Sequence, residues 1–187
     1  ETLTRKYGIK VNPKSEILIT AGAMEGLMDA ILAIVNPGDE VIITSPGFSS
    51  YTEQILMAHG VPRYLPLLEE KNWAIDLEKL PMLITKRTKA ILINSPCNPT
   101  GSIFTKQEMD AIADAVIKNN LILITDEPYE FLTFDGKKTN SLVQDERLRY
   151  NRTSCFSLSK EYAMTGYRVG YAFAEEGMIR QMMKMHD

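Results

Sequence analysis

The sequence predicts an α/β fold of three layers, with a mixed, mostly parallel sheet between two layers of helices. Short apolar runs alternate with segments of helical periodicity along the whole chain, as expected of strand–helix–strand units. Most of these runs are continuously apolar, which is typical of strands covered on both faces. Chemically versatile polar residues follow several of the runs, where ligands bind in such sheets.

The expected strands share β-branched and other apolar residues and end at polar or small residues. In chain order they are Ile17–Thr20, Glu40–Thr44, Lys89–Asn94, Leu121–Asp126, Ser154–Leu158 and Tyr167–Phe173.

Three segments between and after these strands predict helices. Met24–Val35 has apolar residues at helical spacing and stops before Asn36-Pro37-Gly38. Thr105–Asn119 opens with the Thr-x-x-Glu spacing of a capping box. Glu175–Met185 is rich in methionine, and we expect its methionines to pack against a neighbouring domain or subunit.

Length and composition favour one domain in a reducing, intracellular environment. The 187 residues can bury one substantial core, and the net charge of −3 from 21 basic and 24 acidic residues disfavours nucleic acid and anionic membranes as partners. No apolar run approaches the roughly 20 residues that span a bilayer. The two cysteines do not form a disulfide framework, so a cytoplasmic location is expected. No secretory leader is visible, and the start at Glu1 indicates an excised part of a longer protein.

The first polar cluster, Thr20–Gly26, follows a strand and opens a helix. Gly22 could simply supply an unusual backbone angle in a turn. The alternative is an anion site in which the free amides of Ala23 and Met24 face a phosphate group. The cluster matches neither of the common nucleotide-binding glycine patterns.

Two further clusters follow the next buried strands. Asn98-Pro-Thr-Gly101 is typical of a turn. Asp126 ends an apolar strand, where its carboxylate could cap a turn or meet a cationic group of a ligand. Tyr129 could pack in the core with its hydroxyl hydrogen-bonded.

Lys160, between Ser157-Leu-Ser159 and Arg168, carries the sharpest hypothesis. Lysine is ordinarily a solvated surface cation, but burial at a strand end and a second cation nearby both favour the neutral, nucleophilic amine. An amine, a phosphate site, a carboxylate and a phenol together suit a cofactor with an aldehyde, a phosphate, a ring nitrogen and an ionised phenol. Pyridoxal 5′-phosphate has all four groups.

The stretch Ser157–Tyr171, SLSKEYAMTGYRVGY, resembles the lysine signature of the class I and II aminotransferases, which are fold-type I pyridoxal-phosphate enzymes. The signature places a lysine after a small, an apolar and a small residue, with Gly-x-Arg-apolar-Gly downstream. The sequence SKEYAMTGYRVGY within it is most similar to the prokaryotic aspartate and aromatic branch of that family. The family's other landmarks occur in the same order: Gly22-Ala23, Pro46–Tyr51, Asn98–Gly101 and Asp126-x-x-Tyr129.

This resemblance implies roles for the residues that touch the cofactor ring. Lys160 would hold the cofactor as an aldimine and, once displaced, move the substrate's α-proton. Asp126 would pair with the pyridine nitrogen, and Tyr129 and Asn98 would bond the phenolic oxygen. Phe48 would stack on the ring face, although it could equally be a core aromatic.

The resemblance also implies a phosphate cradle. Ser157, Arg168 and the amides of Ala23 and Met24 would hold the phosphate, with Arg168 supplying a forked charge. Ser159 would assist.

The resemblance implies that residues 1–187 are the cofactor-binding large domain alone. Family enzymes run to roughly twice this length, with a small domain built from both termini. The arginine that binds the substrate carboxylate and a tyrosine that reaches the partner subunit would lie outside the chain. We therefore expect a homodimeric parent and little catalysis by this chain alone. Pro128 replaces an apolar residue of the usual motif and leaves the Asp126–Tyr129 spacing intact.

The main functional hypothesis is an aminotransferase that exchanges an amino group between an amino acid and a 2-oxo acid. A C–S lyase or decarboxylase on the same scaffold stays open, as does the effector-sensing domain of a transcription regulator. No metal site is expected, because His59 and His186 have no acidic or cysteine partner at ligand spacing. Cys97 and Cys155 are expected to be small buried residues.

Overall fold

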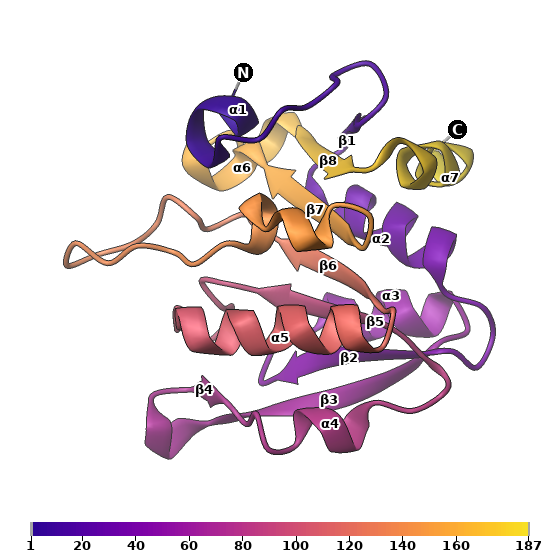
Figure 1. The fold of residues 1–187 in the computed structure, drawn as a ribbon. Coiled ribbons are helices and arrows are strands. Elements are labelled where there is room, and N and C mark those ends of the chain that lie inside the picture. Colours follow the sequence, from indigo (N-terminus) through magenta and orange to yellow (C-terminus); the bar gives the residue numbers. More distant parts are fainter. Residues whose placement is uncertain (1, 187) are drawn as a thin grey trace.

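A computed structural model describes residues 2–186 and contains one mixed eight-stranded sheet (Figure 1). Its strands lie in the order β1-β8-β7-β6-β5-β2-β3-β4. Their bounds are β1 Ile17–Thr20, β2 Glu40–Ser45, β3 Val61–Leu68, β4 Ala74–Ile75, β5 Thr88–Asn94, β6 Ile122–Asp126, β7 Arg152–Ser157 and β8 Gly170–Ala174.

The central strands β7, β6, β5, β2 and β3 are all parallel to one another. β8 pairs antiparallel with β7, and β1 pairs antiparallel with β8, so β1 runs parallel to the central strands. The short β4 pairs antiparallel with β3 at the opposite edge. The expected mixed, mostly parallel sheet is therefore confirmed, and the carboxyl ends of its parallel strands all lie at one rim.

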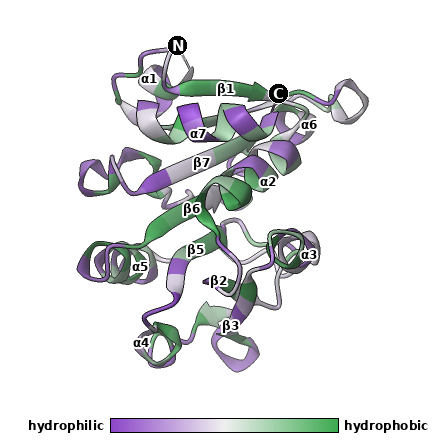
Figure 2. Ribbon diagram, turned by 90° about the vertical axis from the view of Figure 1, so that its right-hand side faces the viewer, coloured by the Kyte–Doolittle hydropathy of each residue, from purple (hydrophilic) through white to green (hydrophobic). Residues whose placement is uncertain are grey.

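Helices cover both faces of the sheet, as Figure 2 shows when viewed across the strands. α2, α3 and α7 pack on one face, and α4 and α5 pack on the other. The bounds of the helices are α1 Thr2–Tyr7, α2 Ala23–Ile34, α3 Ser50–Met57, α4 Leu80–Leu83, α5 Lys106–Lys118, α6 Leu158–Glu161 and α7 Glu176–His186, with 3₁₀ turns at Glu69–Lys71, Leu142–Gln144, Glu146–Leu148 and Thr165–Tyr167.

The period-two geometry of β2 and β5 explains why the middle of each strand is continuously apolar. In β2, Val41 and Ile43 point into the core under α2 and α3, whereas Ile42 points into the core under α5. In β5, Leu92 and Ile91 divide between the two cores in the same way. Both faces of β2 and β5 are covered, so the middle positions of these strands are apolar on both sides.

The predicted capping box begins α5. The Thr105 hydroxyl accepts a hydrogen bond from the Glu108 amide over 3.2 Å, and Glu108 Oε2 accepts one from the Thr105 amide over 2.7 Å. The second oxygen of Glu108 accepts from the Ile75 amide over 2.6 Å. One buried carboxylate therefore starts α5 and ties it to the sheet edge at β4.

Two expected strands, β7 and β8, differ from their expected bounds by more than one residue. β7 ends at Ser157, whose hydroxyl accepts a hydrogen bond from the Ser159 amide and begins α6, so Leu158 is helical. β8 begins at Gly170 and not at Tyr167, because Tyr167 belongs to a 3₁₀ turn and Arg168 has a left-handed backbone with φ of 51°.

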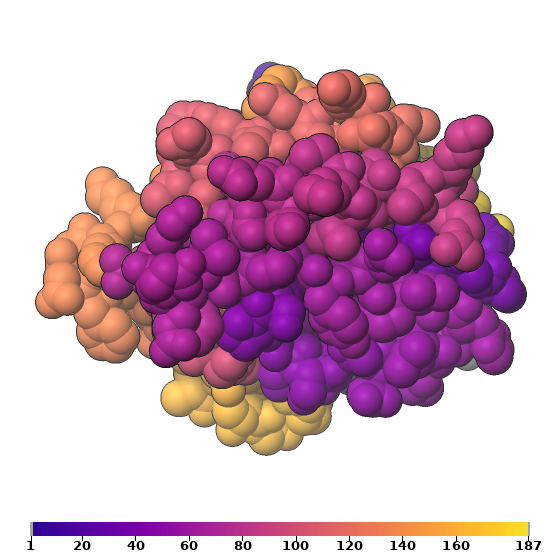
Figure 3. Space-filling model, turned by 90° about the horizontal axis from the view of Figure 1, so that it is seen from below, coloured from indigo at the N-terminus to yellow at the C-terminus, as the bar shows by residue number. Residues whose placement is uncertain are grey.

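Strand β3 was not expected from the sequence, because Pro62 and Pro66 argue against a central strand. The structure tolerates them because β3 pairs fully only with β2, and on its other side it meets β4 only at Leu67 and Leu68. Figure 3 looks onto this edge, where residues of β3, β4 and α4 form the surface. Helices α1, α3 and α4 were likewise not expected.

The packing of α7 on α2 corrects one expectation about His186. Sequence spacing gives this histidine no acidic partner, but its Nδ1 lies 3.6 Å from a Glu25 oxygen and 3.9 Å from an Asp29 oxygen. The three residues come from opposite ends of the chain, so only the fold brings them together. None of the helices within residues 2–186 has the length and apolarity needed to cross a bilayer.

Candidate active site

A cavity of about 390 Å³ lies at the rim where the parallel strands end, and every residue predicted for the site lines it. The predicted residues are Ala23, Met24, Phe48, Asn98, Asp126, Tyr129, Ser157, Ser159, Lys160 and Arg168; four more complete the lining, namely Tyr51, Asn94, Pro128 and Thr165.

One wall of the cavity is the start of α2. Gly22 turns the chain between β1 and α2 with φ of 78°, and Thr20 closes the turn by donating its hydroxyl to the Gly22 carbonyl over 2.8 Å. Gly22 has no side chain with which to cap the helix, so the first amides of α2, at Ala23 and Met24, begin an uncapped helix end. Such an end attracts an anion.

Arg168 lies against this helix start. A Cβ added at Gly22 would stand 2.5 Å from Nη2 of Arg168, so only glycine leaves room for the guanidinium. The left-handed backbone of Arg168 turns its side chain back toward the cavity, where it donates to the Ser159 hydroxyl over 3.3 Å and to the carbonyls of Thr165 and Ala21 over 3.0 and 3.3 Å. The guanidinium, the hydroxyls and the uncapped amides form a site for an anion.

Lys160 lies in α6, one turn after β7. The Ser157 hydroxyl caps this short helix and places Lys160 on the cavity wall, with its Nζ 6.0 Å from the centre of the Tyr129 ring. The residue is exposed. The expectation that Lys160 is buried at the end of a strand is therefore wrong, because the chain forms α6 before it reaches this lysine.

Asp126 occupies the buried floor of the cavity at the end of β6. Its Oδ2 accepts a hydrogen bond from the Tyr51 hydroxyl over 2.6 Å. Its Oδ1 is buried and has no hydrogen-bond partner among residues 2–186. Burial raises the pKa of Asp126 to about 6, against the lowering effect of the Tyr51 hydrogen bond. A cationic N–H donor at Oδ1 would satisfy this oxygen and favour the ionised carboxylate.

A hydrogen-bonded chain of amides connects Asp126 to Tyr129. Asn94 donates its side-chain amide to the Asp126 carbonyl over 2.9 Å and accepts from the Asn98 backbone over 2.8 Å. Asn98 in turn donates to the Tyr129 hydroxyl over 3.3 Å. Burial, with a smaller effect of Asp126, raises the pKa of Tyr129. Phe48 packs edge-on against Tyr51, with 5.6 Å between ring centres.

Sequence reasoning assigned no role to Tyr51 and Asn94. Both carried a signal, since Tyr51 closes the Pro46–Tyr51 landmark and Asn94 ends an apolar strand. Their function could not be read from the sequence, because each acts through a contact with a residue on another strand. Pro128 also lines the cavity, between Asp126 and Tyr129, and Thr165 lines it without any sequence signal that sets it apart.

Comparisons with known proteins agree with this geometry. The family model "Aminotransferase class I and II" matches residues 1–187. The chain is 39% identical to the aspartate aminotransferase of Bacillus subtilis over 99% of its own length and 47% of that protein. It is 35% identical to the aspartate aminotransferase of Pyrococcus abyssi, again over 47% of that protein.

Solved structures give the same result. An aromatic aminotransferase from Pyrococcus horikoshii superposes with a TM-score of 0.94 at 35% identity, over 98% of this chain and 49% of that one. The chain thus spans about half the length of the relatives it matches. The family match over the whole sequence, the fold and the order of the motifs agree: this chain belongs to the class I and II aminotransferase family.

Proposed function

We propose that the chain is the cofactor-binding large domain of a pyridoxal-phosphate aminotransferase, which moves an amino group from an amino acid to a 2-oxo acid. The observation that carries the proposal is the buried Oδ1 of Asp126, which has no hydrogen-bond partner within residues 2–186 and shares one cavity with Lys160 and the donors around Arg168. A carboxylate, an amine and an anion site around one cavity match the ring nitrogen, aldehyde and phosphate of this cofactor.

The residues present fit each part of the cofactor. The α2 amides of Ala23 and Met24, with Ser157, Ser159 and Arg168, would hold the phosphate. Phe48 would cover the ring, and Asn98 and Tyr129 would donate to the phenolic oxygen. The hydrogen bond between these two side chains already holds them next to each other. Asp126 would bind the ring nitrogen, and Lys160 would bind the aldehyde carbon.

The protein's own groups then perform the proton transfers. Bound pyridoxal phosphate supplies an electron sink for the pair left when the substrate loses its α-proton. Lys160, once free, accepts that proton on Nζ. Asp126 keeps a proton on the ring nitrogen by offering a buried carboxylate, and Tyr51 holds that carboxylate in place.

Transamination is favoured over the alternatives because the relatives are named as aspartate and aromatic aminotransferases. We therefore expect a dicarboxylic or aromatic amino acid as donor, in preference to a C–S lyase or a regulatory domain. A cytoplasmic, homodimeric parent is also proposed. It is supported by the free thiols of Cys97 and Cys155 and by the large apolar side chains exposed on α7, Met183 and Met185.

The experiment that tests cofactor attachment uses the chain itself. The protein is incubated with pyridoxal phosphate, reduced with borohydride and digested, and the modified peptide is identified by mass spectrometry. We expect one adduct per chain, on Lys160, and its loss in Lys160→Ala. Lys118→Ala, at an exposed lysine on α5, is the matched control and should keep the adduct. An adduct that survives Lys160→Ala contradicts the assignment.

The reaction itself is tested on the longer parent, because the segment expected to bind the substrate carboxylate lies outside residues 1–187. An amino-donor screen that follows cofactor absorbance measures the first half-reaction, and product analysis distinguishes a 2-oxo acid from the thiol or amine of a lyase or decarboxylase. Formation of the 2-oxo acid with the donor's side chain intact supports transamination, and release of a thiol or of carbon dioxide contradicts it.

A further inference from the structure

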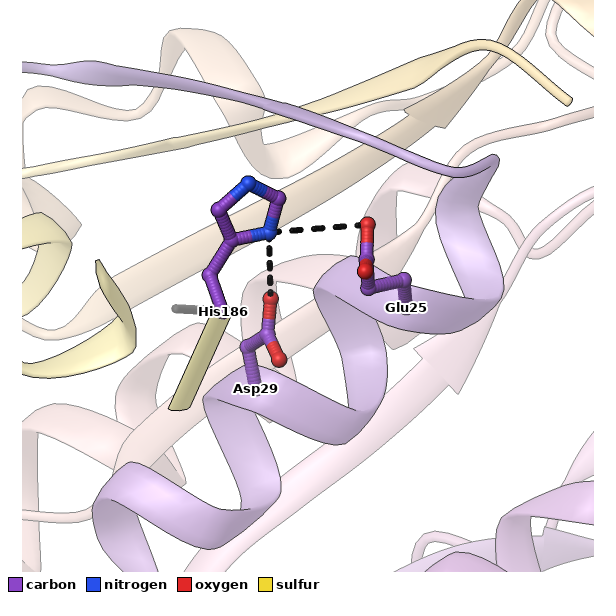
Figure 4. A group of neighbouring side chains, drawn as sticks. All are labelled: Glu25, Asp29 and His186. Carbon is purple, nitrogen blue, oxygen red and sulfur yellow. Dashed lines mark ion pairs between the residues drawn. The ribbon is translucent and has the colours of Figure 1, made fainter. Parts of the chain in front are cut away.

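A second group of ionisable side chains lies where α7 crosses α2, outside the lining of the active-site cavity. It consists of Glu25 and Asp29 on α2 and His186 on α7. In Figure 4 both carboxylates point at the same nitrogen, Nδ1 of His186. One ligand atom from each residue lies within 4.8 Å of the other two.

The separations in this group fit a shared ion better than direct hydrogen bonds. Nδ1 of His186 lies 3.6 Å from Glu25 Oε2 and 3.9 Å from Asp29 Oδ2, beyond the range of a good N–H···O bond. Two ligand atoms on one tetrahedral zinc ion, with bonds of about 2.0–2.1 Å, stand roughly 3.4 Å apart. The two distances from Nδ1 exceed that value by about 0.2 and 0.5 Å, and a ligand oxygen of each carboxylate lies within 4.8 Å of the other, so an ion would draw the three groups together.

Burial of Asp29 is the second, independent observation. Asp29 is only 4% exposed, and its Oδ2, the oxygen nearest His186, has no hydrogen-bond partner within residues 2–186. Glu25 stands one helical turn away on the same face, and like charges at this spacing destabilise a helix. The unsatisfied oxygen and the adjacent charge both call for a cation.

The side chains of Glu25 and His186 are about one third exposed, at 34% and 32%. The group is therefore open on one side, so an ion can enter and keep a water molecule as its fourth ligand. One imidazole and two carboxylates suit zinc and similar divalent transition ions, whereas calcium and magnesium prefer all-oxygen sites with more ligands.

From this geometry we infer that Glu25, Asp29 and His186 form a divalent transition-metal site of the zinc type that joins α7 to the first two turns of α2. Two carboxylates balance the charge of the ion, and the neutral imidazole completes the protein ligands. Since α2 also begins the proposed phosphate site at Ala23, an ion here would hold the helix that positions that site.

The test is a titration of the 187-residue chain, dialysed free of unbound cofactor, with Zn²⁺ by calorimetry and with Co²⁺ by absorption. We expect one saturable site per chain and a thermal midpoint that rises with Zn²⁺ and falls back with EDTA. His186→Ala and Asp29→Asn should each weaken binding by at least the roughly 10–100-fold that loss of an outer-shell partner costs. Because Asp29 is buried, Glu25→Gln serves as a third, more exposed variant and should also weaken binding.

The sequence provides a matched control, because His59 is its other histidine. His59→Ala should bind Zn²⁺ as the unmodified chain does. Equal affinity in His186→Ala and in the unmodified chain overturns the proposal. So does a thiolate-to-cobalt charge-transfer band, which would place the ion on a cysteine. If His186 serves only as a protonated partner of the carboxylates, no saturable binding that depends on His186 will appear, and the site is refuted.

Discussion

Tyr51 donates its hydroxyl to Oδ2 of Asp126 over 2.6 Å and so fixes the one carboxylate on the floor of the cavity. The tyrosine begins α3 after β2, and the aspartate ends β6, so the bond connects two layers of the fold. It leaves Oδ1 as the free oxygen of the pair. The direction in which Asp126 presents that oxygen therefore depends on a residue that need not touch the cofactor.

Tyr51→Phe should weaken cofactor binding by roughly 10- to 100-fold, because a hydrogen bond to a charged group contributes about 1.5–3 kcal/mol. Loss of this bond also removes an influence that lowers the pKa of Asp126, so that pKa should rise further. The measurement is a fluorescence or absorbance titration with pyridoxal phosphate. Tyr64→Phe, at a half-exposed tyrosine on β3, should bind as the unmodified chain does. Equal affinities in both variants would show that the Tyr51 bond has no effect.

Asp126→Ala should separate attachment from catalysis. Lys160 keeps its position in α6, so the borohydride-reducible adduct should still form. Removal of the α-proton in the parent should slow by roughly 100- to 1,000-fold, as when one preorganised electrostatic partner is lost. The half-reaction, followed by cofactor absorbance, measures this. Unchanged turnover would remove Asp126 from its proposed role.

Gly22→Ala should damage the phosphate site specifically. The new Cβ would lie 2.5 Å from Arg168 Nη2 and displace the guanidinium. Gly38→Ala is a matched control, since Gly38 has φ of 85° and open space around its Cα. Alanine at either position also costs stability, because both backbones have a positive φ that side chains rarely adopt. For Gly22, whose φ of 78° and ψ of 173° suit essentially only glycine, this cost is roughly 1–3 kcal/mol.

Only Gly22→Ala should also lose affinity for pyridoxal phosphate, by about 10-fold or more if one charge-assisted contact is lost. Denaturant unfolding and cofactor titration on the same two samples distinguish strain from displacement. Equal cofactor affinity in Gly22→Ala and Gly38→Ala would mean that Arg168 does not hold the phosphate.

The sequence predicted what depends on local pattern. Apolar runs predicted the central strands, because both faces of β2 and β5 are covered, and Thr105 with Glu108 predicted the start of α5. The rule that parallel strand ends meet at one rim grouped four polar clusters, and the resemblance to the aminotransferase family implied the individual roles, with Phe48 among them. Strand β3 was missed, because its prolines are tolerated only by its place near the sheet edge.

Contacts between distant segments could not be predicted. The exposure of Lys160 follows from the Ser157 cap, which starts a helix where a strand was expected to continue. The carboxylate partners of His186 lie at the other end of the chain and meet it only through the packing of α7 on α2. The contacts of Tyr51 and Asn94 with Asp126 likewise depend on strand order, which no local pattern specifies.

Glu127→Gln should stabilise the chain above neutral pH. Burial raises the pKa of Glu127 from 4.5 to about 7, while Ser141 donates to its Oε1 over 2.9 Å. The folded state thus binds a proton at Glu127 more tightly than the unfolded state does, and this tighter binding adds to the free energy of unfolding. The contribution is full below pH 4.5 and is lost as pH rises toward 7. The free energy of unfolding should fall by about 3 kcal/mol over this pH range as a result. The free energy of unfolding in urea should decrease less between pH 5 and pH 8 in Glu127→Gln than in the unmodified chain. Glu70→Gln, at an exposed site, should behave as the unmodified chain. Identical pH dependence in both variants would contradict the buried titration.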